Sequence, residues 1–208
     1  MFDFSSMLTF VVVVLGLFLV PGPAVLLVFT STAQGGRKVG VMTGLGIATG
    51  DFIHTVCAAV GLSAVLMTSA LAFTVIKVVG AAYLIYLGIR AILAKQGDAV
   101  AVRVQPMSPV NAYLQAVPAE LLNPKTALFF LAFMPQFVDP SKGSALLQFG
   151  VLGLVFVVMS SLYTTCIAFS VRPLGRLLKN LSCLQRWQGK IIGSMFIGLG
   201  LKLAFQQR

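Results

Sequence analysis

Leu121-Leu122-Asn123-Pro124-Lys125-Thr126-Ala127 stands in the middle of a long apolar run, which places it inside a membrane. Its proline removes a backbone donor and clashes with the carbonyl four residues back, so the helix must break or kink there. A bilayer tolerates such a break only where protein buries it or where it lines a wet cavity. Asn123 and Lys125, with Glu120 one turn earlier, therefore mark a candidate site at the break.

A second break interrupts the first apolar run at Pro21-Gly22-Pro23. One broken helix in each half of a membrane protein is the sequence pattern that best indicates a transport site. Broken helices expose N–H groups at one end and carbonyl groups at the other. These ends suit the carboxylate and the ammonium of a zwitterionic ligand.

The composition indicates an integral membrane protein with almost no extramembrane domain. Of the 208 residues, 58% are hydrophobic and 10% are charged, and the mean hydropathy is +0.98. Long apolar runs recur from end to end, as in multi-span membrane proteins. The first run, residues 7–30, has no basic segment before it and no Ala-x-Ala cleavage pattern. We therefore expect it to be a membrane span and not a removed signal peptide.

Six apolar runs are long enough to cross the hydrocarbon core, which takes about 20 helical residues. They cover residues 7–30, 40–68, 70–93, 111–137, 145–171 and 187–206. Basic residues concentrate around the connections after the first, third and fifth runs, which predicts that these connections face the cytoplasm. Topology therefore explains the net charge of +10 better than nucleic-acid binding does, because no basic, aromatic-rich soluble patch exists.

An internal repeat supports this division of the chain. The stretch Lys77-Val-Val-Gly-Ala-Ala-Tyr-Leu84 matches Lys190-Ile-Ile-Gly-Ser-Met-Phe-Ile197. The halves would be residues 7–93 and 111–206, joined by a linker at 94–110. Three helices in each half would invert the second copy, although glycine-rich apolar helices also resemble one another by chance. We predict an all-α integral membrane fold in one domain (residues 1–208), with six transmembrane helices in two inverted three-helix repeats and broken first and fourth helices.

Asp51 and His54 stand three residues apart in the second run, so they share a helix face. A carboxylate at membrane depth is costly and is normally paired or placed beside a water-filled path. Histidine changes charge near neutral pH, so the two side chains could form a proton relay. The alternative is structural: Asp51 satisfies a neighbouring broken helix, and His54 satisfies a buried carbonyl.

Small and polar residues predict how the helices meet. Gly46 and Gly50, and likewise Gly150 and Gly153, would let helices approach closely. Ser160 and Thr164 would line a cavity, or would bond their own helix backbone. The cysteines lack Cys-x-x-Cys spacing, and Asp51, His54 and Glu120 are too scattered for a metal cage, so we expect no cofactor and no metal.

Motifs in a fixed order along the chain are similar to those of a known family. They are Val20-Pro21-Gly22-Pro23-Ala24, Gly44-x-Gly46-x-x-x-Gly50-Asp51-x-x-His54, Gly80-Ala81-Ala82-Tyr83-Leu84-x-Tyr86-Leu87-Gly88, and Leu122-Asn123-Pro124-Lys125 running to Phe133-Met134-Pro135-Gln136-Phe137. With the last helix (Gly193-Ser194-Met195-Phe196-Ile197-Gly198) they cover nearly the whole chain. Each motif is loose alone, but the ordered set resembles the LysE/RhtB family of small bacterial amino-acid exporters.

The resemblance implies a multi-pass exporter of the bacterial cytoplasmic membrane, and not an enzyme. It implies an amino acid or close derivative as substrate, proton antiport as the driving reaction, and a homodimer in the lipid bilayer. On this interpretation the substrate or the coupling proton meets a set of ten residues. They are Pro21, Gly22, Pro23, Gly50, Asp51, His54, Glu120, Asn123, Pro124 and Lys125.

Two departures from the family pattern affect this interpretation. Members often carry Asn where Glu120 stands, and many carry an acid in the fifth helix where this chain has Ser160. Coupling would then depend on Asp51 or Glu120. Two other functions stay open at this point. One is export of another small solute or a metal cation, and the other is a thiol–disulfide electron carrier, which needs a reactive cysteine pair.

The basic connections at 31–39, 94–110 and 172–186 are predicted to be cytoplasmic, because the excess of Lys and Arg sets orientation. Single cysteines placed at Gln34, Gln96 and Asn180 should therefore resist a membrane-impermeant thiol reagent in intact cells. Efficient labelling at two of the three positions would overturn the inverted-repeat topology.

Overall fold

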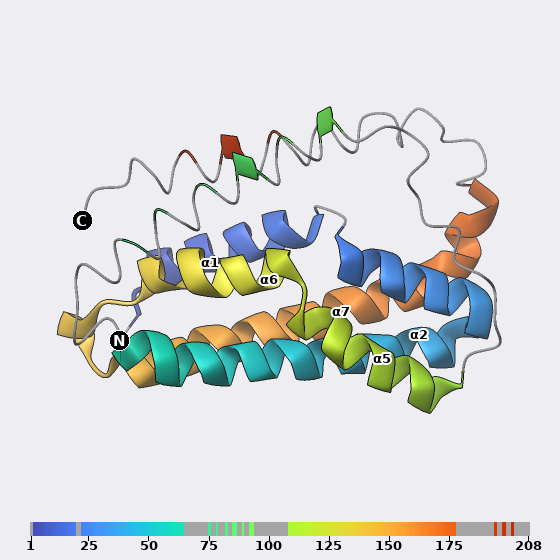
Figure 1. Cartoon of the computed structure of the whole chain (residues 1–208), viewed down its shortest axis with the longest axis horizontal. Coiled ribbons are helices and arrows are strands. Elements are labelled where there is room, and N and C mark those ends of the chain that lie inside the picture. The colour runs from blue at the N-terminus through green and yellow to red at the C-terminus, as the bar shows by residue number, and fades with distance from the viewer. Residues whose placement is uncertain are drawn as a thin grey trace. The chain divides into compact units, whose positions relative to one another are not determined.

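A computed structural model describes residues 2–19, 22–64 and 108–177, together with isolated positions between 75 and 93 and between 194 and 201. The chain divides into two compact units, residues 1–64 with 104–172 and residues 65–103 with 173–208. The first unit holds nearly all of the described residues and is the subject below. Throughout these residues every regular element is a helix (Figure 1).

The helices of the described residues follow a simple order along the chain. They are α1 (Phe4–Leu19), α2 (Pro23–Cys57), which continues as the π-helix η1 (Ala58–Leu62), α5 (Pro109–Leu121), α6 (Pro124–Leu128), the π-helix η2 (Phe129–Phe133), the 3-10 turns η3 (Met134–Phe137) and η4 (Pro140–Lys142), and α7 (Ala145–Leu177). The elements α5 to η3 fill the predicted fourth span, and α7 contains the predicted fifth span. The predicted third and sixth spans, the linker and the repeat match lie outside the continuously described residues.

Helices are interrupted where the prolines predict it. α1 ends at Leu19, and α2 begins at Pro23 with Gly22 as its N-cap residue. α5 ends at Leu121, and Asn123 caps α6 through its side chain, which accepts a hydrogen bond from the backbone N–H of Lys125. Proline suits the first helical position, because its missing N–H would have no helical partner there. Pro21 itself lies outside the described residues.

The connection predicted at residues 31–39 is a single turn at Gly36 and not a loop. Gly36 has a φ of 81°, a backbone conformation that favours glycine, and helix continues on both sides of it. Val28 and Ile47 share one buried cluster with Ala116 and Ala168, so the two parts of α2 fold back against each other. We expected a basic loop between the apolar runs 7–30 and 40–68, but one glycine is enough for the turn.

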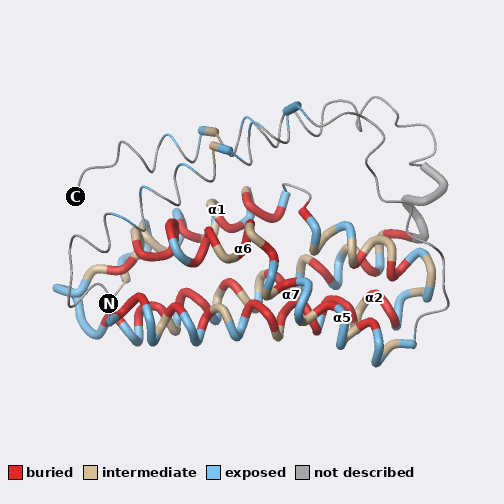
Figure 2. The backbone as a smooth tube through the Cα atoms, viewed as in Figure 1, coloured by how far each residue is buried: buried red, intermediate tan, exposed pale blue. Residues whose placement is uncertain are grey.

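By length and composition, two described helical segments could cross a membrane: Ala145–Val171, and Pro23–Leu62, which includes the turn at Gly36. α1 is a shorter apolar helix. Its outer face carries exposed apolar side chains at a helical spacing, and its other face is buried, as expected for a helix between protein and lipid (Figure 2). The exposed large apolar residues are Phe4, Leu8, Val12, Leu15 and Leu19.

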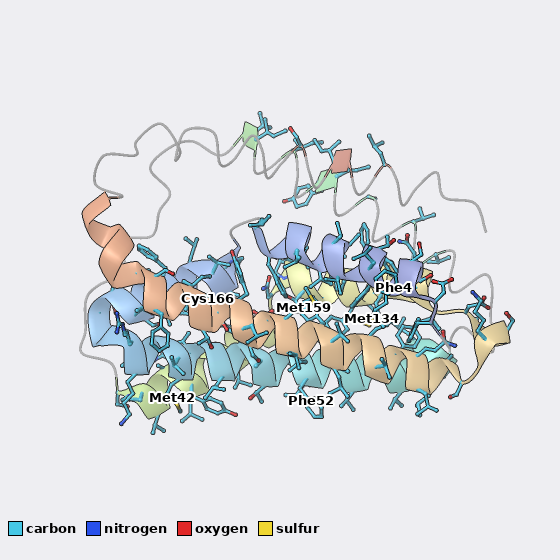
Figure 3. The ribbon with its side chains drawn as sticks, turned by 180° about the vertical axis from the view of Figure 1, so that it is seen from behind. Phe4, Met42, Phe52, Met134, Met159 and Cys166 are labelled. Carbon is cyan, nitrogen blue, oxygen red and sulfur yellow. The ribbon has the colours of Figure 1, made fainter. Side chains whose placement is uncertain are left out.

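Phenylalanine rings join α1, η2 and α7. The ring centroid of Phe156 lies 5.2 Å from that of Phe18, 5.0 Å from that of Phe129 and 5.1 Å from that of Phe130. Phe10, Phe133 and Tyr163 extend this cluster, whereas Phe52 stays outside it. Phe52 is 47% exposed and points away from α7 in Figure 3.

Close contacts between helices depend on glycine at three of the four predicted positions. A Cβ atom at Gly46 would clash with the Tyr113 carbonyl of α5, and one at Gly153 would clash with Thr55 of α2. A Cβ atom at Gly50 would lie 2.7 Å from the Cβ of Glu120. Gly150 does not fit the prediction within the described part of the chain, where no atom lies within 4 Å of a Cβ atom placed there.

Gly153→Ala should destabilise the protein, because the new methyl group overlaps the Thr55 side chain; overpacking typically costs about 1–3 kcal/mol. Gly150→Ala, one turn away on the same helix, should leave stability unchanged or raise it by up to about 1 kcal/mol through helix propensity. Thermal unfolding of the two purified variants measures the difference. Equal melting temperatures would contradict the close contact between α7 and α2.

Candidate functional site

The break between α5 and α6 carries a buried hydrogen-bond network around Glu120. Asn123 donates from Nδ2 to both carboxylate oxygens of Glu120, at 3.1 Å each, and the Thr126 hydroxyl donates to Oε1. Glu120, Asn123 and Thr126 are all at most 3% exposed. The geometry explains the polar residues of this stretch, because a buried carboxylate must be hydrogen-bonded to be tolerated.

Asp51 faces this network from α2 and has no comparable set of partners. Its side chain is 1% exposed, and its nearest polar neighbours are the Ser160 hydroxyl and the Glu120 carboxyl, neither of which reaches its oxygens with good hydrogen-bond geometry. Glu120, Ser160 of α7 and Lys125 are close enough to interact with it electrostatically or as polar neighbours. Gly50 makes the approach possible, since a side chain there would displace Glu120.

Lys125 joins the two helix breaks. Its ammonium donates a hydrogen bond of 3.0 Å to the carbonyl oxygen of Leu17 in the last turn of α1. The end of its side chain lies against Gly22, where a Cβ atom would come within 3.3 Å of Nζ. The Lys125 side chain is buried, with 8% of its surface exposed. Residues more than 100 positions apart in the sequence thus meet at one place.

Pro21 explains why the Leu17 carbonyl needs this partner. In a continuous helix, this oxygen would accept from the N–H of the residue four positions later, which is Pro21 and has no N–H. The carbonyl of Leu19 loses its helical donor to Pro23 in the same way. A cation at the C-terminal end of a helix is also favoured by the helix dipole.

His54 contacts the backbone of the α5–α6 break and an aromatic ring of η2. Its Nε2 atom lies 3.3 Å from the carbonyl oxygen of Glu120, and its ring stacks on Phe130 with centroids 5.6 Å apart. This arrangement corresponds to the structural alternative, in which His54 satisfies a buried carbonyl. Thr164 likewise bonds the carbonyl of Ser160 in its own helix, whereas Ser160 lies beside Asp51.

The buried cluster of Asp51, Glu120 and Lys125 contains two carboxyl groups and one ammonium. It is electrically neutral when one carboxyl group carries a proton, and it has one negative charge when neither does. Uncompensated charge is costly in such surroundings, so the cluster suits binding of a proton or of a second cationic group. No group of three His, Cys, Asp or Glu residues that could hold a metal ion occurs in the described part of the chain.

Two members of the site carried no clear sequence signal. Thr126 completes the Glu120 network, and the Leu17 carbonyl accepts from Lys125. Spacing provides a signal in retrospect, because prolines at 21 and 23 identify the two carbonyl groups that lose helical donors. Which lysine would reach them depends on tertiary packing.

Comparison with known proteins gives a consistent result. A family model described as LysE type translocator matches residues 15–207. The chain is 32% identical to an uncharacterized membrane protein of Bacillus subtilis, covering 95% of this chain and 97% of the relative. It is 31% identical to an uncharacterized membrane protein of Pseudomonas aeruginosa, covering 94% and 93%. It is 30% identical to a leucine efflux protein of an Enterobacter strain, covering 98% and 99%. No solved structure matches the chain.

Thr126→Val keeps the size of the side chain but removes a hydrogen bond to buried Glu120, which should lower the free energy of unfolding by about 1–3 kcal/mol. Thr43→Val is the matched control, because Thr43 is equally buried and its hydroxyl bonds only the Val39 carbonyl of its own helix among the described contacts. Thermal unfolding compares the two. A loss no larger in Thr126→Val than in Thr43→Val would show that the network does not stabilise the fold.

Proposed function

The chain belongs to the LysE type translocator family, and we propose that it exports an amino acid or a close derivative across the bacterial cytoplasmic membrane by proton antiport. Proteins of this family are transporters and not enzymes, and some relatives are named leucine efflux proteins. We therefore set aside the thiol–disulfide carrier. The proposal includes six spans in a lipid bilayer and a homodimer, as the family resemblance implies.

The observation that carries the proposal is the meeting of both helix breaks at the buried cluster of Asp51, Glu120 and Lys125. Ionisable groups at membrane depth mark substrate paths and proton relays, because their burial would otherwise be selected against. Irregular backbone within the membrane also marks such paths, because it is tolerated only where protein buries it or where it lines a water-filled cavity. Both features coincide here within one packed unit.

The ends of the broken helices suit the two charged groups of an amino acid. The N-cap of α2 is Gly22, which offers no side chain to its first N–H groups, so a substrate carboxylate has donors there. The C-terminal carbonyls of α1 and the two carboxyl groups accept from a substrate ammonium. The apolar part of the substrate would then lie against the neighbouring phenylalanine and leucine side chains.

Asp51 is the carboxyl group that we assign to proton coupling. Glu120 already accepts from Asn123 and Thr126, which fix its position and satisfy its oxygens. Asp51 has only the Ser160 hydroxyl as a neighbouring donor and no well-formed hydrogen bond among the described residues, so its interactions depend more on whether it carries a proton. Protonation from the outer side and release to the inner side would drive export of one substrate in each cycle.

Export is tested first in cells preloaded with each of the standard amino acids, with and without overexpression of the protein. Faster appearance of at least one amino acid outside the overexpressing cells is expected. If no amino acid leaves faster, the substrate belongs to another class of small solute.

Asp51→Asn should abolish uphill efflux driven by a proton gradient while sparing exchange of substrate between equal compartments. The substitution removes the titratable proton but keeps the size of the side chain and its capacity for hydrogen bonds. Asp3→Asn is the control, because Asp3 is exposed near the N-terminus and pairs only loosely with Lys142 at 4.0 Å. Proteoliposomes with an imposed pH gradient measure both activities. Accumulation by Asp51→Asn at the wild-type rate would move the coupling role elsewhere.

A further inference from the structure

The ammonium of Lys125 lies where the chemistry of the site would place the ammonium of a substrate. It donates to the Leu17 carbonyl at the end of α1, whose donor in a continuous α-helix would be the missing N–H of Pro21, and both Glu120 and Asp51 are within electrostatic reach of it. A primary ammonium of an amino acid seeks the same acceptors, since both groups are compact cations with three N–H donors.

We infer that Lys125 is a tethered competitor, whose ammonium fills the substrate-ammonium site of the empty transporter and is displaced when substrate binds. The inference rests on the proposed export function and assigns a role to one residue of that site. The ligand class is a small molecule with a free primary ammonium. An acylated or deaminated analogue lacks the group that replaces Lys125.

Gly22 leaves room for a substrate ammonium to replace the ammonium of Lys125. The terminal atoms of Lys125 lie directly over this glycine, and a Cβ atom there would approach Cδ to 3.4 Å and Cε to 3.5 Å. Because the lysine stem is flexible and Gly22 has no side chain, the ammonium can withdraw without moving backbone atoms. A residue with a side chain at position 22 would weaken the contact with Leu17 by crowding the lysine.

Displacement of Lys125 has a structural consequence. The hydrogen bond from Lys125 to Leu17 connects α6 to the end of α1, so its loss removes a polar link between the two breaks while the aromatic contact between Phe10 and Phe129 remains. Substrate binding would thereby release the connection that holds the empty state. A ligand that binds only after displacement favours the released conformation by its differential affinity.

The test uses the purified full chain in lipid nanodiscs, with Lys125→Ala compared with Lys142→Ala. Lys142 is a matched lysine that is 52% exposed. Ethylammonium chloride is the probe of the vacated position, with sodium chloride at equal ionic strength as the reference. Ethylammonium should raise the melting temperature of Lys125→Ala but not that of the wild type or of Lys142→Ala.

Amino-acid binding supplies the second readout. Radiolabelled leucine, and then each other standard amino acid, is titrated against the wild type and Lys125→Ala. If Lys125 fills the site about nine-tenths of the time, its removal should lower the dissociation constant of the bound amino acid about tenfold. Ethylammonium should compete with that amino acid in the variant, whereas 4-methylpentanoate, which has leucine's carbon skeleton without the ammonium, should not compete.

Three results would overturn the inference: no stabilisation of Lys125→Ala by ethylammonium, weaker or unchanged amino-acid binding, or stabilisation without competition. The last result would make Lys125 a structural cap of α1 only. If Lys125→Ala does not fold, Lys125→Met, which keeps an apolar stem but has no ammonium, replaces it in the binding assay and should bind the amino acid more tightly than the wild type; unchanged or weaker binding contradicts the inference. Failure of the proposed function is seen separately, as the absence of amino-acid export by the wild type.

Discussion

The hydrogen bond from Lys125 to the carbonyl of Leu17 is the contact on which the arrangement of the two helix breaks depends. A helix broken inside an apolar environment leaves carbonyl groups without donors, and the bilayer supplies no water to satisfy them. Here a lysine from one break supplies the donor for the other. The same lysine offsets part of the negative charge of Glu120 and Asp51, so one side chain links backbone satisfaction to charge balance.

Small residues allow these polar groups to meet. Gly50 admits Glu120 against α2, Gly22 admits the end of Lys125, and Gly153 lets α7 approach Thr55. Hydrophobic contact alone drives helix association weakly in lipid, so close backbone packing and polar contacts between helices must contribute. The buried network and the glycine contacts therefore support each other: neither would persist at the wider separation that larger side chains impose.

The sequence predicted a substantial part of this arrangement. Prolines predicted both interruptions of the helices, apolar length predicted the long helix at residues 145–171, and the polar residues near Pro124 predicted the buried network at the second break. The turn at Gly36 could not be predicted from the polar residues around it, because one positive φ angle replaces a whole loop. The placement of His54 beside the Glu120 carbonyl could not be predicted either. A helix face shared with Asp51 does not determine which neighbour each side chain contacts. The six-span topology, the repeat and the homodimer remain predictions.

The central claim is that the cluster at the two breaks is the place where substrate binds. Ser160 lies beside Asp51, so Ser160→Cys in a chain whose native cysteines are replaced by serine places one thiol at the site. The measurement is the rate at which 2-aminoethyl methanethiosulfonate modifies this thiol, with and without the exported amino acid. Substrate should slow modification of Ser160→Cys but not that of Ser161→Cys, one position further along α7. Equal rates with and without substrate, or no modification of Ser160→Cys at all, would contradict the claim.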